Sequence, residues 1–397
     1  MFYFANMHLS HILLVLIVPH VLLTVECQKS DNEHSSTSDR IISSAASDGI
    51  PLDRLPFSVA AFQSIDALRH IKINGSMISS SASKVDVHTH AVPDFYATLV
   101  PVTGGSPTPH WDLETHLNFM ASNGIAHSIL SISTPGSVVF IGNETYSVGL
   151  ARLLNEWMAE VVRLFPQYIS FYAVTPLPYV SAALKEVKYS VDKLGAVGIG
   201  LMSNHEGYYL GNPLLRDFFA ELEIMELRMK SKNILVHPTL PSKRLEDGGL
   251  ADANPTVYTS GRVEFYFETA RTVMDLTFTQ TFQNFTSLKY IIPHCGGAFP
   301  SIEDRSLSSN PRLKNNSQEI YNTRLWYDSA GPTFPHQVQG LLAYGVPKTQ
   351  LVYGSDFPYS QPNNSYGASI AAIGSASFLT DGEKEGLFSG NAGRLFA

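Results

Sequence analysis

From Lys84 to the C-terminus, short runs rich in β-branched and aromatic residues alternate with longer segments of helical periodicity. Eight runs are predicted to be strands: 85–90, 126–133, 169–175, 196–202, 234–238, 288–294, 325–329 and 351–355. Eight strand–helix alternations over about 310 residues are typical of one α/β fold, the (β/α)8 or TIM barrel. The alternative, a doubly wound open sheet, usually has a glycine-rich phosphate-binding turn after its first strand, and no such turn follows residue 90. We therefore expect a barrel, with its functional side chains at the C-terminal ends of the strands.

The segments between the predicted strands have the spacing of apolar residues that amphipathic helices require. The predicted helices are 112–122, 147–165, 181–194, 213–229 and 262–282. Near the C-terminus, Thr380 and Glu383 stand three residues apart, which predicts a capping box at the start of a short helix.

Residues 1–27 have the features of a signal peptide. Residues 12–25 are an apolar run that Pro19 and His20 interrupt, and the run is short for a membrane span. We expect cleavage before Gln28, entry into the secretory pathway (ER lumen, vacuole or exterior) and no stable membrane insertion afterwards. Because no Lys or Arg precedes the apolar run, an uncleaved anchor and a mispredicted start are the alternatives. Five sequons agree with secretion and glycosylation: Asn74, Asn143, Asn284, Asn315 and Asn363.

Residues 28–83 form a serine-rich N-terminal extension, in which 14 of 56 residues are Ser. The part up to about Asp48 has the composition of a solvated linker. Residues 57–73 are apolar enough to form a helix that docks on the main body. Residues 84–397 are then expected to form the catalytic domain.

The composition excludes several classes of protein. With 44% hydrophobic and 16% charged residues, the chain can bury a large core and does not have a disordered composition. Its 27 Lys and Arg against 35 Asp and Glu give a net charge of −8, which argues against a nucleic-acid partner, because phosphate binding needs a basic face. A small anionic ligand is compatible with this charge, since a local pocket can oppose it.

Four of the predicted strands end in histidine or aspartate. His88 and His90 are two residues apart on the first strand, so their imidazoles share one face. The fifth strand ends at His237, the sixth at His294 and the eighth near Asp356. Polar groups that leave a buried strand are costly unless they have a partner, so their convergence indicates a metal site. His88, His90, His237 and Asp356 would suit one Zn²⁺ with open positions, or Mn²⁺, and His294 would then be a general acid or base.

Four segments that carry these residues resemble the decarboxylase branch of the amidohydrolase superfamily: VDVHTH, ILVHPTLP, IIPHCGGAFP and LVYGSDFPYS. This branch includes aminocarboxymuconate-semialdehyde, γ-resorcylate and 6-methylsalicylate decarboxylases. WDLETHLNFMASNGI, GYYLGNP, VEFYFETAR and LWYDSAG resemble the 6-methylsalicylate decarboxylases in particular. The resemblance covers residues 84–397 and implies a metal-dependent (β/α)8 barrel of the amidohydrolase type.

The resemblance implies roles for individual residues. It makes His88, His90, His237 and Asp356 metal ligands and His294 a catalytic imidazole. Arg305, eleven residues after His294, falls where aminocarboxymuconate-semialdehyde decarboxylase has a substrate-binding arginine donated across a dimer. We therefore expect a homodimer.

Two departures from related enzymes refine this expectation. The loop from residue 91 to residue 110 has no Lys or Arg, where the semialdehyde decarboxylase has an arginine, so a monocarboxylate substrate is favoured over a dicarboxylate. The end of the fourth strand, residues 198–204, has no lysine to bridge two metals, so one metal ion per subunit is expected.

Further residues near these motifs are candidate substrate contacts. Asn204 follows the fourth strand and Phe299 follows the His294 motif. With Phe95, Tyr96 and Tyr359, Phe299 would form an aromatic wall.

The sequence thus predicts a carboxy-lyase that removes CO2 from a hydroxylated aromatic acid without oxidation. The narrowest hypothesis is 6-methylsalicylate to 3-methylphenol (m-cresol) and CO2. Asp356, or a water acting through His294, would supply the proton, and no organic cofactor is needed because the protonated ring accepts the electron pair. Two alternatives stay open: a mononuclear metal-dependent hydrolase of a lactone or amide, and a protein that binds an aromatic ligand without turnover.

Overall fold

The computed structural model describes residues 37–71, 78–229, 231–359 and 366–397. The predicted signal peptide and the sequons at Asn74 and Asn363 lie outside these ranges. Within them, no helix combines the length and apolar character needed to cross a lipid bilayer.

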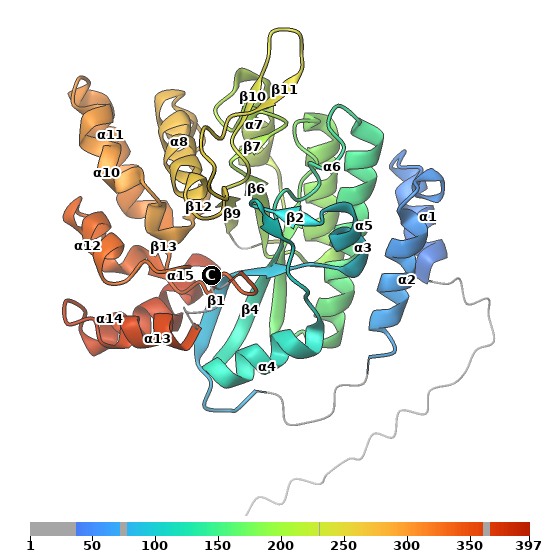
Figure 1. Cartoon of the computed structure of the whole chain (residues 1–397), viewed down its shortest axis with the longest axis horizontal. Helices are drawn as coiled ribbons and strands as arrows, with labels where there is room; N and C mark the ends of the chain where they lie inside the picture. The colour runs from blue at the N-terminus through green and yellow to red at the C-terminus, as the bar shows by residue number, and fades with distance from the viewer. Residues whose placement is uncertain (1–36, 72–77, 230, 360–365) are drawn as a thin grey trace, which may run out of the picture. The chain divides into compact units, whose positions relative to one another are not determined.

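Eight strands form one sheet whose neighbours follow the order of the chain and pair in parallel (Figure 1). They are β1 (Lys84–Ala91), β4 (Ile125–Ile132), β5 (Ile169–Val174), β6 (Gly198–Met202), β9 (Lys232–His237), β12 (Leu288–Ile292), β13 (Leu325–Asp328) and β14 (Leu351–Val352). The backbone N–H of Val87 in β1 donates to the carbonyl of Tyr353, just after β14, at 3.0 Å. This bond joins the first strand to the last, so the predicted barrel is confirmed.

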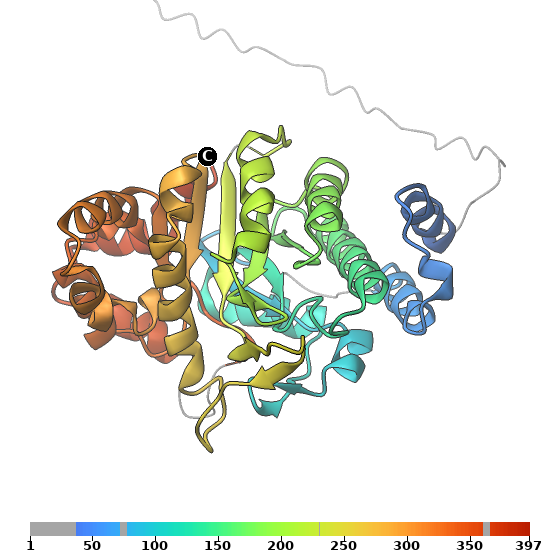
Figure 2. The same ribbon diagram turned by 90° about the horizontal axis from the view of Figure 1, so that it is seen from above.

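Helices lie outside the strands, as the view from above shows (Figure 2). The larger ones are α4 (Leu113–Asn123), α5 (Glu144–Leu164), α6 (Val180–Tyr189), α7 (Arg216–Ile224), α8 (Glu264–Phe278), α10 (Phe299–Leu307), α11 (Pro311–Thr323), α12 (His336–Ala343) and α13 (Tyr366–Gly374). Local sequence fixes their ends: Asp112 caps α4 by accepting from the N–H of Thr115, and Gly124 ends it at φ 65°. The predicted capping box of Thr380 and Glu383 is present at α14 (Asp381–Glu385).

Two predicted helices differ in length from the observed ones. The segment predicted as 213–229 is helical only to Ile224, because Asp192 accepts from the backbone N–H of Arg228 at 2.9 Å and draws the chain away. The segment 262–282 is divided into α8 and α9 (Thr281–Asn284) by Gln280, whose φ is 59°.

The described part of the N-terminal extension packs on α5. It forms α1 (Thr37–Ser47) and α2 (Ser58–Leu68), drawn in blue beside α5 in Figure 1. Arg40 and Arg69 pair with Glu156 and Glu160 of α5, both at 2.9 Å. The docked helix within 57–73 is confirmed. The expectation of a solvated linker up to Asp48 is wrong from Thr37 onward, because α1 buries Ile41 one turn before Ala45.

The N-terminal half of the barrel interior is filled with apolar side chains. Val87, Tyr172, Leu235 and Trp326 belong to this interior cluster, together with Leu395 of α15 (Asn391–Leu395). The side chain of Asn233 donates to the carbonyl of Leu395 at 3.1 Å, which holds the C-terminal helix against this end. Polar chemistry is thus confined to the opposite end, where the strands have their C-termini.

Candidate metal centre

Three strands bring four metal-binding side chains together. His88 and His90 come from β1, His237 is the last residue of β9, and Asp356 follows β14. One ligand atom from each of the four lies within 4.8 Å of the others. The Nε2 atoms of His88 and His90 are 3.1 Å apart, and Oδ1 of Asp356 is 3.1 Å from Nε2 of His90. The residues predicted as ligands therefore form one cluster.

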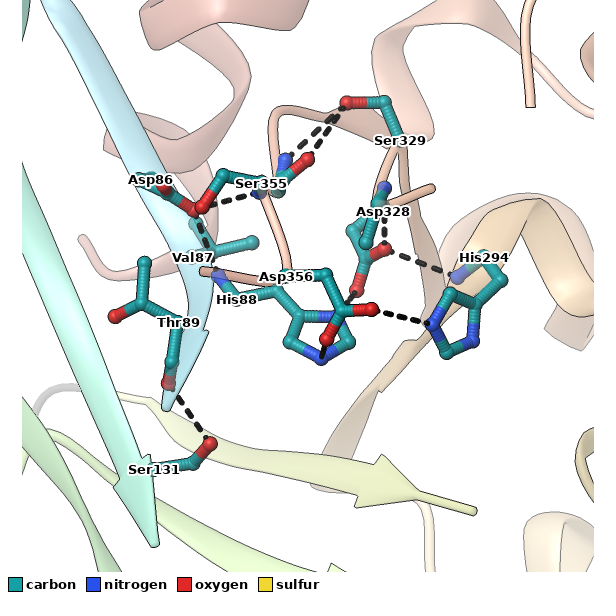
Figure 3. A network of polar contacts seen from close by, with 12 residues as sticks. Asp86, Val87, His88, Thr89, Ser131, His294, Asp328, Ser329, Ser355 and Asp356 are labelled. Atoms are coloured by element: carbon teal, nitrogen blue, oxygen red, sulfur yellow. Dashed lines mark hydrogen bonds and ion pairs between the residues drawn. The ribbon is translucent and has the colours of Figure 1, made fainter. Parts of the chain in front are cut away.

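The hydrogen bonds made by Nδ1 of His88 and Nδ1 of His90 determine which nitrogen of each ring is available to coordinate a metal ion. Nδ1 of His88 lies 2.8 Å from Oδ2 of Asp328, and a carboxylate only accepts, so this nitrogen carries the proton (Figure 3). Ser131 donates to the carbonyl of Thr89 at 2.9 Å, so its oxygen accepts from Nδ1 of His90 at 3.0 Å. Nε2 is then the nitrogen of each ring that would coordinate a cation in the cluster.

The donor set fits a divalent cation. Nδ1 of His237 is buried and has no hydrogen-bond partner among the described residues. Burial, together with the neighbouring His90 and His88, lowers the pKa of His237 well below its usual value, so its imidazole is neutral and able to coordinate. Three imidazoles and one carboxylate are a ligand set of the kind that binds Zn²⁺ or Mn²⁺ with positions left for substrate.

Asp328, the last residue of β13, connects the metal ligands to His294. Its Oδ2 accepts from His88, and its Oδ1 accepts from the backbone N–H groups of His294 and Ala330, both at 3.0 Å. Burial alone would raise the pKa of Asp328, but the adjacent His88 lowers it, so the carboxylate stays ionised. Sequence reasoning missed this residue, although its position at the end of a predicted strand was the same signal that identified the ligands.

Asp86 joins the two chain segments that supply ligands. Its buried Oδ1 accepts from the backbone N–H of His88 at 3.2 Å and from that of Ser355 at 3.0 Å. Burial raises the pKa of this carboxyl to about 7. Asp356, which follows Ser355 in the chain, has a φ of 62° and donates its own N–H to the carbonyl of His88 at 2.9 Å. The left-handed turn at Asp356 is therefore held directly against β1.

His294 lies beside the cluster and faces Asp356. Its Nε2 is 3.7 Å from Oδ2 of Asp356 (Figure 3), and the ring of Tyr266 stacks on its ring with centroids 5.4 Å apart. Four consecutive residues from His294 to Gly297 have positive φ, and a Cβ at Gly297 would come within 2.5 Å of the carbonyl of Tyr266. Gln337 of α12 donates to the carbonyls of His294 and Gly297 and so clamps both ends of this turn.

The cluster opens into a cavity of about 850 Å³. His90, His237, His294 and Asp356 line its inner part, and the side chain of Asp356 is 22% exposed. Aromatic residues form much of the wall: Phe265, Tyr266, Tyr359 and Tyr366. The arrangement places ligand atoms, one further imidazole and flat apolar surfaces around a single space, as an aromatic acid requires.

The structure places the other predicted site residues away from this cavity, except Tyr359. Phe299 is fully buried in the core, where its ring packs on that of Tyr321 with centroids 5.0 Å apart. Asn204 is buried and donates to the carbonyl of Leu240 at 3.0 Å and to Glu268, so its amide is already engaged. Phe95 and Tyr96 are also core residues; the hydroxyl of Tyr96 donates to the carbonyl of Ser133 at 2.8 Å. These positions do not support substrate contacts for Phe299 and Asn204.

Arg305 lies on the exposed side of α10 and does not line the cavity of its own chain. Its predicted role as a substrate ligand therefore depends on a second subunit. Sequence reasoning did not assign Phe265 and Tyr266 to the site, although both lie in the segment VEFYFETAR, because the spacing of apolar residues in 262–282 is that of a helix packed on the core.

A (β/α)8 barrel with three histidines and an aspartate at its C-terminal end defines a class of metal-dependent enzymes. Residues 85–397 match the amidohydrolase family model, and the chain belongs to this family.

Curated relatives place the chain in one branch of that family. It is 30% identical over 292 residues to decarboxylase yanB of Aspergillus niger, covering 70% of this chain and 77% of the relative. It is 27% identical over 289 residues to 6-methylsalicylic acid decarboxylase of Penicillium expansum, covering 70% and 85%. The resemblance to the decarboxylase branch and the prediction of a carboxy-lyase are confirmed.

Solved structures show the same fold. A crystal structure of amidohydrolase II is similar with a TM-score of 0.70 at 28% identity, covering 79% of this chain and 99% of the other. A dihydroxybenzoic acid decarboxylase of Polaromonas sp. JS666, crystallised with manganese and an inhibitor, has a TM-score of 0.63 at 19% identity, covering 79% and 96%.

Proposed function

We propose that the protein is a metal-dependent, non-oxidative decarboxylase of an aromatic acid with a hydroxyl group next to its carboxylate. The observation that carries this proposal is the position of His294 and Asp356, 3.7 Å apart, between the metal ligands and the aromatic wall of one cavity. The relatives named above support the class of substrate.

His88, His90, His237 and Asp356 would hold one Zn²⁺, with Mn²⁺ as the alternative that the Polaromonas decarboxylase supports. When bound, the ion supplies a positive charge that fixes the substrate carboxylate and hydroxyl and stabilises developing negative charge. One ion per subunit agrees with β6, which contributes no residue to the ligand cluster.

The protein's own groups move the proton. Replacement of CO2 by hydrogen requires protonation of the ring carbon that bears the carboxylate. The carbon–carbon bond then breaks, its electron pair returns to the ring, and CO2 leaves. A proton on Nε2 of His294, 3.7 Å from Oδ2 of Asp356, would lie at the cavity surface, where that carbon could receive it.

The aromatic wall orients the ring during this transfer. Tyr266 stacks on His294, and the ring of Tyr359 meets that of His90 edge-on at 5.2 Å. A planar substrate held between such faces keeps its reacting carbon in line with the proton donor, and these apolar faces keep bulk water away.

The narrowest proposal for the substrate is 6-methylsalicylate, which would give 3-methylphenol and CO2. Its test is product analysis with the Zn²⁺-loaded protein, with and without a chelator. Formation of both products, abolished by the chelator, is the expected result. A folded, metal-replete sample that releases no CO2 from any ortho-hydroxy aromatic acid, but opens lactones or amides, would overturn the proposed decarboxylase function.

A further inference from the structure

The charge of the cavity wall is carried by very few residues. Apart from the histidines, the ionisable side chains that usually carry charge at neutral pH are Asp356, which belongs to the ligand cluster, and Arg262. Arg262 is exposed, and its guanidinium has no hydrogen bond or ion pair within the described ranges of the chain. A cation without a protein partner at the wall of a ligand cavity is available to bind an anion.

The backbone around Arg262 is fixed although its side chain is not. The N–H of Arg262 donates to the carbonyl of Thr259 at 3.0 Å, and that of Gly261 donates to Gly104 at 2.8 Å. Gly104 connects the two short strands β2 (Val102–Thr103) and β3 (Ser106–Pro107), which carry no basic residue. Arg262 is therefore a single cation on a fixed backbone between this hairpin and the start of α8, and the hairpin adds no second cation beside it.

The electrostatics of the whole chain make this cation more significant. The net charge is −8, so an anionic substrate approaches a protein that repels it on average. A guanidinium can bind a carboxylate through two parallel hydrogen bonds, which gives both affinity and direction.

The size of the cavity indicates where such an anion would be on the substrate. About 850 Å³ is near the upper end of the range of about 300–1,000 Å³ that encloses drug-sized ligands, and a single-ring benzoate fills only part of it. If the reacting carboxylate lies at the metal ligands, the remaining space extends along the aromatic wall to Arg262.

We propose that Arg262 is a specificity-determining residue that selects aromatic acids with a second anionic group, remote from the carboxylate that is lost. This inference rests on the proposed decarboxylase function. It replaces both the expectation of a monocarboxylate, which considered only the loop from 91 to 110, and 6-methylsalicylate as the preferred substrate, because that acid has no second anionic group. The second group stays on the product, so the reaction converts a dianionic aromatic acid and one proton to a monoanionic phenol and CO2.

The test compares matched ligands by calorimetry on the Zn²⁺-loaded protein. The ligands are 2-hydroxybenzoates with an alkyl chain of increasing length that ends in either a carboxylate or a carboxamide. We expect the carboxylate series to bind about tenfold more tightly at one chain length. Arg262→Gln should remove this preference, and Arg262→Lys should keep part of it.

A matched control removes the same charge elsewhere. Arg312 of α11 is exposed and does not line the cavity, so Arg312→Gln should keep the preference. Equal binding of both series at every length, or an equal loss for both in Arg262→Gln, would overturn the proposal. Tighter binding of the carboxylate series without CO2 release would instead support the role of Arg262 and refute the decarboxylase function, so the two failures can be told apart.

Discussion

His88 and Asp328 are both completely buried, and Nδ1 of the imidazole lies 2.8 Å from Oδ2 of the carboxylate. Burial disfavours the charged imidazole, but the carboxylate of Asp328 prevails and raises the pKa of His88 to about 9 when no cation is bound. A bound cation would take the place of the extra proton on Nε2 of His88. The proton on Nδ1 would stay on the imidazole, in the hydrogen bond that Asp328 accepts.

Replacement of Asp328 should therefore weaken metal binding. Asp328→Asn keeps the size of the side chain but removes the charge that fixes the His88 tautomer, so we expect metal affinity to fall by about 10- to 100-fold. Competition with a chromogenic chelator measures this change. Asp304→Asn, at an exposed position on α10, is the control and should bind metal normally. Unchanged affinity in Asp328→Asn would contradict the tautomer argument.

Replacement of His294 should separate catalysis from metal binding. His294 is outside the ligand cluster, so His294→Ala should keep about one metal ion per subunit and lose about 10²- to 10⁴-fold in kcat. Metal analysis and single-turnover kinetics on one preparation check both quantities. Loss of the metal in this variant would show that His294 is itself a ligand.

Gln337 should act through the turn that carries His294. Gln337→Met preserves length but removes the donor to the carbonyls of His294 and Gly297, so the imidazole loses its fixed position. We expect kcat to fall by about tenfold or more while KM changes little. The control is Gln339→Met on the same helix, whose amide donates to Pro335 at 3.0 Å on the exposed side. Equal kinetics for the two variants would refute a positioning role for Gln337.

Glu303 of α10 should make stability depend on pH. Its side chain is buried, Oε1 has no hydrogen-bond partner in the described part of the chain, and burial, with Asp304 nearby, raises its pKa to about 7. The folded state then binds the proton more tightly than the unfolded state. The free energy of unfolding should fall as pH rises from about 4.5 to about 7, by about 3 kcal/mol, and level off above that.

Glu303→Gln should remove that fall and be more stable than the parent chain at pH 8. Denaturant unfolding at pH 5 and pH 8 measures the effect. Glu319→Gln, exposed on α11, should leave the pH dependence unchanged. A parent chain at least as stable as Glu303→Gln at pH 8 would contradict the assignment.

Arg305 should act only in an assembled dimer. Arg305→Ala and His294→Ala should each be inactive, whereas a re-equilibrated mixture of the two should recover about one quarter of the parent activity, because half of the dimers then hold one intact site. Sedimentation gives the mass of the parent. A monomeric mass, or a mixture that stays inactive, would refute the proposal that the arginine is shared between subunits.

Much of the fold and of the ligand cluster was predictable because both depend on local patterns. Each predicted strand overlaps an observed one, and the side chain at a strand's C-terminal end has little freedom in where it points. His88, His90, His237 and Asp356 could thus be grouped before any distance was known.

Residues on loops and helices were predictable only in part, because distant partners decide where their side chains lie. Asn204 is held by Glu268, 64 residues away, and Phe299 turns into the core rather than toward the ligands. The prediction of a solvated linker at α1 was wrong because it relied on the high serine content and did not consider the apolar residues Ile41 and Ala45, which lie four residues apart on one face of the helix. Arg262 directly precedes the segment VEFYFETAR, but nothing in that pattern indicates that its side chain lines the cavity beside Gly104.

The metal ligands bridge the seam at which the barrel closes, and this affects how the protein assembles. His90 and Asp356 are 266 residues apart, and the second of them arrives only after the final strand has docked on the first. An incomplete barrel has only a partial ligand set, so its affinity for the ion should be much lower than that of the finished fold. Any free energy of metal binding is then gained by the fully folded chain alone. An ion would bind after the barrel has closed, and it would have to dissociate before β1 and β14 could separate.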